Sequence, residues 1–115
     1  MSDTIFGKII SGEIPSELLY EDEHCVVIND INPQAPVHVL IIPRQGISRL
    51  ADAQDTDQAL LGHLMLVAGK VARQLGVEEA FRLIINNGAE AGQTVFHLHL
   101  HIIAGREFAE GQMAG

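Results

Sequence analysis

The chain has one cysteine and no tryptophan among its 115 residues, and its 15 acidic residues outnumber its 7 basic ones. The single thiol, Cys25, excludes an intrachain disulfide and a cysteine-based metal site, so we interpret it as a reduced core residue. The formal net charge of -8 would repel a phosphate backbone or an anionic membrane, which argues against general binding to nucleic acid or membranes. Any bound phosphate must therefore be held by local groups.

Long hydrophobic runs are also missing. The longest uninterrupted apolar runs are only as long as a strand, and the first residues lack the basic and apolar regions of a secretory signal. We therefore expect a cytoplasmic protein. A length of 115 residues with 47% hydrophobic and 19% charged content suits one globular domain, which we place at residues 1–115.

The hydrophobic pattern changes several times between helical and strand periods, which predicts an α+β domain. Apolar residues at helical spacing after a Thr4 N-cap predict a short helix that ends at Gly12. A longer helix is predicted from a Thr56 N-cap to a Gly76 C-cap, and its apolar residues cover more than one stripe. Five strands are predicted, the first two forming a hairpin: 18–20, 25–28, 37–42, 81–85 and 96–104.

Two loops contain residues suited to holding a ligand. The loop 30–36 begins with Asp30 and contains Pro33 and Pro36, which fix their own φ angles and favour extended backbone in the residues before them. This loop should therefore be stiff. The tetrapeptide 92–95, Gly-Gln-Thr-Val, offers backbone amides, a carboxamide and a hydroxyl just before the last strand. Such a tetrapeptide is either an ordinary turn or a phosphate site that needs no lysine or arginine.

Three histidines alternate with leucines in the segment 97–101, namely His97, His99 and His101. Because side chains alternate between the two faces of a strand, the histidines should share one face while the leucines point into the core. A solvated sheet face would explain one such histidine, but three in alternation favour a function. His38 lies on another predicted strand and is a fourth candidate. His24 and His63, in a turn and on the long helix, have no companions, and we assign them no role.

Imidazole groups in this arrangement support two kinds of chemistry. A zinc site is one, but His97 and His101 lie about 13 Å apart along a strand, so a third ligand would have to come from His38. Nucleophilic catalysis fits better, because a neutral imidazole can attack phosphorus and form a transient phosphoramidate. We predict that the central His99 attacks the α-phosphorus of a nucleotide conjugate, with His97 fixing its orientation and with His101 and His38 donating to phosphate oxygens. We expect no metal and no other cofactor.

The segment 97–103, His-Leu-His-Leu-His-Ile-Ile, resembles the signature of the histidine-triad (HIT) nucleotide-binding proteins. Four further segments resemble the Hint branch of that family in order and spacing, so the resemblance covers nearly the whole chain: 3–10, 30–38, 60–65 and 91–95. The resemblance implies a five-stranded antiparallel sheet, a short N-terminal and a long helix, and a two-fold homodimer formed through the long helix and the strand 81–85. It also implies hydrolysis of adenosine or guanosine phosphoramidates, including nucleotide–lysine conjugates.

The same resemblance implies a role for each site residue. His99 would be the nucleophile, with the other three histidines around the phosphate or supporting the nucleophile. Asp30 would accept hydrogen bonds from both ribose hydroxyls. The phosphate site would be lined by Asn86, Gln93 and Thr94. The purine pocket would be formed by apolar residues, any of which can instead be plain core: Ile5, Phe6, Ile9, Ile28, Ile31 and Leu40.

Two features depart from the Hint pattern. Thr94 replaces the more usual serine but keeps the hydroxyl, and the tail after Gly105 lacks the tryptophan-containing ending of some members, which leaves the preferred leaving group open. Three alternatives to the phosphoramidase also stay open. The segment 91–95 also resembles the branch that cleaves dinucleoside polyphosphates. A nucleotide-binding scaffold with little turnover and a zinc-binding module are the other two.

Overall fold

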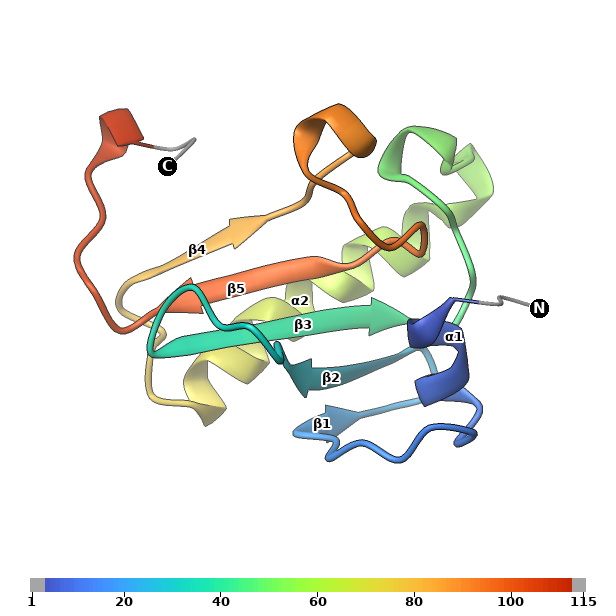
Figure 1. Cartoon of the computed structure of the whole chain (residues 1–115), viewed down its shortest axis with the longest axis horizontal. Helices are drawn as coiled ribbons and strands as arrows, with labels where there is room; N and C mark the ends of the chain where they lie inside the picture. The colour runs from blue at the N-terminus through green and yellow to red at the C-terminus, as the bar shows by residue number, and fades with distance from the viewer. Residues whose placement is uncertain (1–3, 113–115) are drawn as a thin grey trace.

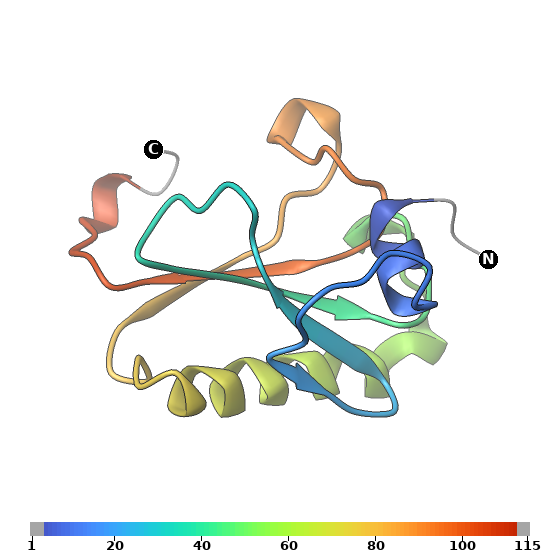
Figure 2. The same ribbon diagram turned by 60° about the horizontal axis from the view of Figure 1, so that its bottom comes forward.

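The computed structural model describes residues 4–112, so Asp3 of the N-terminal motif lies outside the described residues. Five antiparallel strands form one sheet in the order β1-β2-β3-β5-β4. The strands are β1 (Tyr20–Glu21), β2 (Cys25–Asn29), β3 (Val37–Pro43), β4 (Phe81–Ile84) and β5 (Leu100–Ala104). One face carries the long helix α2 (Gln58–Gln74), and the other carries α1 (Ile5–Ile10) and the β2–β3 loop (Figures 1 and 2). This is the α+β arrangement that the sequence predicts.

Alternation along the central strands gives each face of the sheet its own hydrophobic cluster. On β3, Val39 and Ile41 belong to the cluster that includes Leu64, Val67 and Val71 of α2. The intervening Leu40 and Ile42 belong to the cluster that includes Phe6 of α1. Because side chains two residues apart share a face, His38 lies on the α1 side with Leu40. The site described below is therefore on the face opposite α2.

The N-terminal ends of the two helices are capped in different ways. Thr4 is the predicted N-cap of α1, and its Oγ1 accepts a hydrogen bond from the backbone N–H of Gly7 at 3.1 Å. The predicted Thr56 cap of α2 is wrong, because Asp57 occupies the N-cap position. The Asp57 side chain makes no cap hydrogen bond to α2; its carboxylate accepts the backbone N–H of Gln54 at 2.9 Å, in a capping box that belongs to the preceding 3₁₀ turn, Asp55–Asp57. The same carboxylate accepts Nε2 of Gln45 at 2.9 Å, so the Asp57 side chain is held by contacts outside α2.

The C-terminal end of α2 and its outer surface also bear on the predictions. Leu75 is the C-cap, and Gly76, the predicted cap, follows it with a φ angle of 73°, a left-handed conformation that favours glycine. Met65 and Leu66 on α2 are 47% and 68% exposed, so part of the apolar surface of this helix is not covered by the described chain. Within residues 4–112, no helix is long and apolar enough to cross a membrane.

The first hairpin pairs β1 with β2 in antiparallel fashion, as predicted. The first strand begins at Tyr20, two residues later than expected, although Leu19 still donates its backbone N–H to Val27 at 2.8 Å. Asp22 closes the turn, since its Oδ1 accepts the backbone N–H groups of His24 at 2.7 Å and Cys25 at 2.9 Å. This local side-chain bonding is typical of aspartate in turns.

The last strand differs most from expectation, because it begins at Leu100 and not at residue 96. Ile41 of β3 is paired with Leu100, and the β3 residue two positions further along is Pro43. Proline has no backbone N–H with which to continue the ladder, so regular pairing ends there. His97 and His99 therefore lie on the segment leading into β5, and only the third histidine is within the strand.

Candidate active site

The register of β3 and β5 brings two of the four predicted histidines together. His38 is opposite Ile103, and His101 is opposite Leu40, so the two rings are diagonal neighbours on the same face. His38 Nε2 lies 2.9 Å from His101 Nδ1. The rings of His101 and His99 are adjacent as well, with centroids 5.0 Å apart. Three histidines from two segments thus form a continuous row.

Backbone groups determine which nitrogen of each ring in this row carries a proton. The backbone N–H of Gln34 donates to His38 Nδ1 at 3.0 Å, so in the neutral ring the proton of His38 is on Nε2. That proton faces His101 Nδ1, and the proton of His101 is then on its Nε2. This last nitrogen is buried without a hydrogen-bond partner among residues 4–112. The chain of hydrogen bonds from Gln34 through His38 to His101 therefore ends in a buried N–H donor, which a ligand can use.

In His99 the proton is on the other ring nitrogen, Nδ1. Its Nδ1 lies 2.7 Å from the backbone carbonyl oxygen of His97, which only accepts hydrogen bonds, so Nδ1 carries the proton. Burial lowers the pKa of His99, against the opposing effect of that hydrogen bond, so the ring is neutral at pH 7. Nε2 then has a lone pair, and it makes no hydrogen bond within the described part of the chain. His99 is therefore poised for attack through Nε2.

His97 acts on His99 through its backbone, and its ring points elsewhere. Nε2 of His97 donates to the carbonyl oxygen of Pro43 at 2.7 Å, and the residue is 1% exposed. Burial lowers the pKa of His97 as well. The same Pro43 that ends the pairing of β5 thus uses its carbonyl to hold the segment that positions His99. We predicted that His97 fixes the orientation of His99, and in the structure its backbone carbonyl contacts His99 while its ring is buried.

Electrostatics keep His101 uncharged. Burial first, and then the neighbouring rings of His99 and His38, lower the pKa of His101 from its ordinary 6.5 to about 4. A positive charge on one of these closely packed rings disfavours a positive charge on the ring beside it. Near pH 7, His101 is therefore a neutral hydrogen-bond donor.

Asp30 lies next to this row at the start of the β2–β3 loop. Its Oδ1 accepts the backbone N–H of Asn32 at 2.8 Å, while Oδ2 lies 3.4 Å from His38 Nε2. The Asp30 side chain is 19% exposed, so it is within reach of a bound molecule. Asp30, His38 and His101 also have ligand atoms within 4.8 Å of one another, a set that could hold a metal ion. His97 is not part of that set.

The residues predicted to line a phosphate differ in what their side chains already bond. Gln93 is 3% exposed, its Oε1 accepts the N–H of Gly88, and its Nε2 donates to two carbonyl oxygens, those of Ser48 and Val95. Its carboxamide is thus occupied in holding the loop before His97. Thr94 is exposed, and Asn86 is partly buried, with its side chain beside Gly92.

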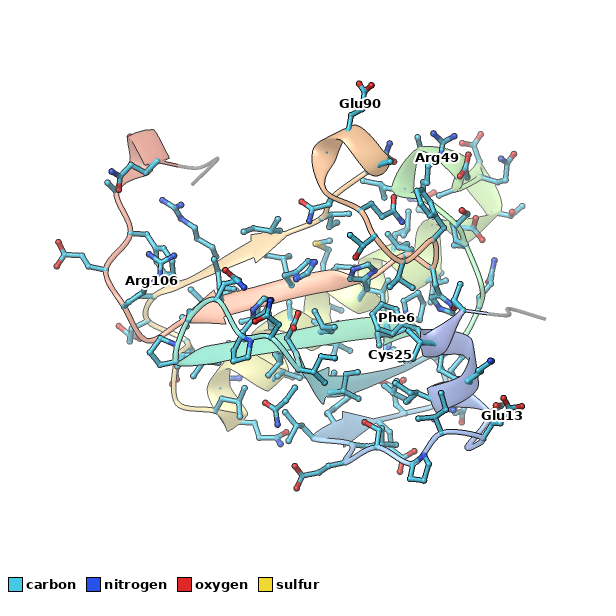
Figure 3. The ribbon with its side chains drawn as sticks, viewed as in Figure 1. Phe6, Glu13, Cys25, Arg49, Glu90 and Arg106 are labelled. Atoms are coloured by element: carbon cyan, nitrogen blue, oxygen red, sulfur yellow. The ribbon has the colours of Figure 1, made fainter. Side chains whose placement is uncertain are left out.

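The predicted apolar pocket divides into exposed and buried members. Phe6 packs edge-to-face on His99 with ring centroids 4.8 Å apart, and Figure 3 shows it reaching from α1 over the sheet. Ile5 and Ile31 are 47% and 97% exposed, which leaves them available to a ligand. The remaining three lie in the cluster beneath α1: Ile9, Ile28 and Leu40.

Sequence reasoning missed several contacts and was wrong about two histidines. The amide of Gln34 and the carbonyl of Pro43 carry no sequence signal, because any residue type has such backbone groups. His24 and His63 do have companions: their ring centroids are 4.8 Å apart, and His63 Nε2 lies 2.7 Å from Asp22 Oδ2. Only the docking of α2 on the first hairpin brings them together.

Both the five-stranded antiparallel sheet and the row of His38, His101 and His99 on one of its faces can be compared with known proteins. The HIT domain model matches residues 11–108. An uncharacterized HIT-like protein of Synechocystis is 60% identical over 107 residues, covering 93% of this chain and 94% of that protein. The chain belongs to the HIT family.

Solved structures agree in fold. A HIT family hydrolase from Legionella pneumophila superposes with a TM-score of 0.91 at 39% identity, covering 94% of this chain and 97% of that one. A histidine triad nucleotide-binding protein from Candida albicans has a TM-score of 0.79 at 36% identity, covering 87% of this chain and 73% of that one. Both superpose on most of this chain.

Proposed function

We propose that this protein is a HIT hydrolase that cleaves the P–N bond of adenosine or guanosine phosphoramidates, including nucleotide–lysine conjugates, with residues 1–115 acting as one domain. The observation that carries the proposal is the 2.7 Å hydrogen bond from His99 Nδ1 to the carbonyl of His97. It leaves the lone pair of Nε2 free for attack. Hydrolase and nucleotide-binding relatives support the same class of reaction.

The reaction has two displacements at phosphorus. In the first, His99 Nε2 bonds to the α-phosphorus, the bond to the amine nitrogen breaks, and the amine takes up a proton from solvent as it leaves. Because Nδ1 keeps its proton, the nucleotidyl-histidine ring is positively charged, and the His97 carbonyl stabilises that charge. In the second, water supplies a hydroxyl to phosphorus, the P–N bond to His99 breaks, and the remaining proton of water replaces the one taken by the amine.

The neighbouring histidines assist without forming covalent bonds. We assign the Nε2–H of His101 to a non-bridging phosphate oxygen, because this donor is buried and has no partner within residues 4–112. His38 orients His101 through their 2.9 Å contact. Both nitrogens of His38 are engaged by the protein, so it acts on the substrate through His101.

Groups around the histidine row would recognise the substrate. We assign the ribose hydroxyls to Asp30, whose Oδ2 is not saturated by backbone N–H groups. The exposed Ile5 and Ile31 would cover the purine, supported from below by Phe6, Ile9 and Ile28. Thr94 and Asn86 would contact the phosphate, and Gln93 would hold their loop through its three hydrogen bonds.

Steady-state hydrolysis tests this function. Purified protein should hydrolyse an adenosine phosphoramidate faster than diadenosine triphosphate, and His99→Ala should reduce that rate by at least about a thousandfold. His99→Gly with added imidazole should recover part of it. Circular dichroism of each variant is the control for folding. Binding of AMP without turnover by the parent protein would contradict the proposal in favour of a scaffold.

We also propose the two-fold homodimer, with α2 and β4 at its interface. Met65 and Leu66 expose apolar surface on α2, and β4 is an edge strand whose residues are only partly buried. A two-fold contact would cover both surfaces at once. Sedimentation equilibrium at micromolar concentration should give a dimer for the parent and a monomer for Leu66→Lys. A monomeric parent would contradict this assignment.

A further inference from the structure

A second cluster of metal-ligating side chains lies on the α2 side of the sheet. Asp22 comes from the β1–β2 turn, Cys25 begins β2, and His63 projects from α2. One ligand atom from each lies within 4.8 Å of the other two. Cys25 packs in the cluster shared with α2, so this site and the histidine row are on opposite faces of the sheet. The two are chemically separate.

The carboxylate at the centre of this cluster is firmly positioned. Oδ1 of Asp22 accepts the backbone N–H groups of His24 and Cys25, and Oδ2 lies 3.0 Å from the Tyr20 hydroxyl and 2.7 Å from His63 Nε2. Burial opposes ionisation, but these hydrogen bonds outweigh it and hold the pKa of Asp22 well below its usual range. The site therefore has a fixed negative charge.

The thiol of Cys25 is fully buried beside that charge. Burial first, and then the charge of Asp22, raise its pKa to about 12, so without a cation the thiol keeps its proton. A metal ion is the partner that makes a buried thiolate stable. One cysteine cannot form a metal site by itself, but here a carboxylate and an imidazole lie beside it.

A cavity lies beside the cluster and has one of its three members, His63, in its wall. A cavity of about 420 Å³ is lined by His24, Arg44, Gln45, Leu60 and His63, among others. The His24 ring contacts that of His63 edge-to-face. His24 is exposed, so it can turn to supply a further nitrogen at the mouth of the cavity.

We propose that Asp22, Cys25 and His63 bind a Zn²⁺ ion, with His24 or a water molecule as the fourth ligand. Zinc ligands lie about 2.0 to 2.3 Å from the metal, so a tetrahedral set has its ligand atoms about 3.3 to 3.8 Å apart. The cluster needs shifts of only about 1 Å to reach this spacing. Thiolate and imidazole donors with one carboxylate also suit zinc better than magnesium or calcium.

Binding changes the proton positions in a defined way. The Cys25 thiol releases its proton to solvent as the S–Zn bond forms. In neutral His63, the proton moves from Nε2 to Nδ1, and the metal takes the place of the hydrogen bond to Asp22 Oδ2. The ion would then tie the β1–β2 hairpin to α2, so zinc should raise the thermal midpoint of unfolding.

Titration with Co²⁺ tests the site directly, because a bond from cobalt to thiolate gives a near-ultraviolet charge-transfer band and Cys25 is the only cysteine. The parent should show this band, with saturation at one equivalent and displacement by Zn²⁺. Cys25→Ser should abolish it, and His63→Asn and Asp22→Asn should weaken binding by at least about tenfold. Asp55→Asn, which removes the same charge from an exposed position, should leave it unchanged.

A second comparison separates this site from the histidine row. The double variant His38→Asn, His101→Asn should retain the charge-transfer band, although any cobalt held by Asp30 and these histidines would be lost. Absence of the band in the folded parent would overturn the proposal. Cobalt binding that survives Cys25→Ser but not the double variant would do the same. If Cys25→Ser does not fold, the loss of affinity in His63→Asn decides the outcome.

Discussion

Protonation of His101 should destabilise the protein between pH 7 and pH 4. Burial and the adjacent rings of His99 and His38 lower its pKa to about 4 in the folded state, whereas in the unfolded chain it titrates near 6.5. Between these values the unfolded state binds more protons, so stability is lost as the pH falls through this window. At ~1.4 kcal/mol for each pH unit, the loss from His101 is about 3 kcal/mol.

Urea unfolding followed by far-ultraviolet circular dichroism measures this loss in a chain without tryptophan. The parent and His101→Asn are compared at pH 7 and pH 4, at one protein concentration. The parent should lose about 3 kcal/mol more than the variant, because other titrating groups, Asp22 among them, are present in both and cancel. Losses that agree within about 0.5 kcal/mol would refute the depressed pKa and the packing that causes it.

Three further outcomes are expected. The acid limb of a plot of kcat/KM against pH should have a midpoint below 6.5, because burial lowers the pKa of His99 and only its neutral ring attacks. A midpoint above 7 would be inconsistent with this. Gln93→Ala should lower the free energy of unfolding, measured by urea titration, by about 2 to 4 kcal/mol, because three hydrogen bonds are lost. A smaller loss of stability together with a raised KM would indicate that Gln93 binds the phosphate directly. Gly105→Ala should cost about 1 to 3 kcal/mol in the same assay, since φ is 92° and the added Cβ would lie 2.9 Å from Pro36; an unchanged midpoint would contradict this.

The fold was predictable wherever one local pattern decides the outcome. The apolar run of β3 predicts a strand at 37–42, one residue shorter than the observed Val37–Pro43, and Thr4 caps α1 as its position indicates. The strand that begins at Leu100 was predicted too long, because Pro43 limits its pairing from the neighbouring strand. Such a limit depends on register, which a pattern within one segment does not contain.

The candidate site was predictable in its residues more than in its geometry. Alternation identified the three histidines, but the inward ring of His97 depends on a carbonyl from β3, 54 residues earlier in the chain. The companions of His63 were missed for a similar reason, since Asp22 is 41 residues away in sequence. Contacts of this kind arise from tertiary packing, and the spacing of residues within one segment does not predict them.

The covalent intermediate offers the sharpest test of the proposed chemistry. Protein mixed with a labelled adenosine phosphoramidate, quenched within one turnover and digested, should yield one acid-labile adenylylated peptide with the label on His99, and none from His99→Ala. Adduct on a different residue, or hydrolysis by His99→Ala at the parental rate, would contradict attack by this imidazole.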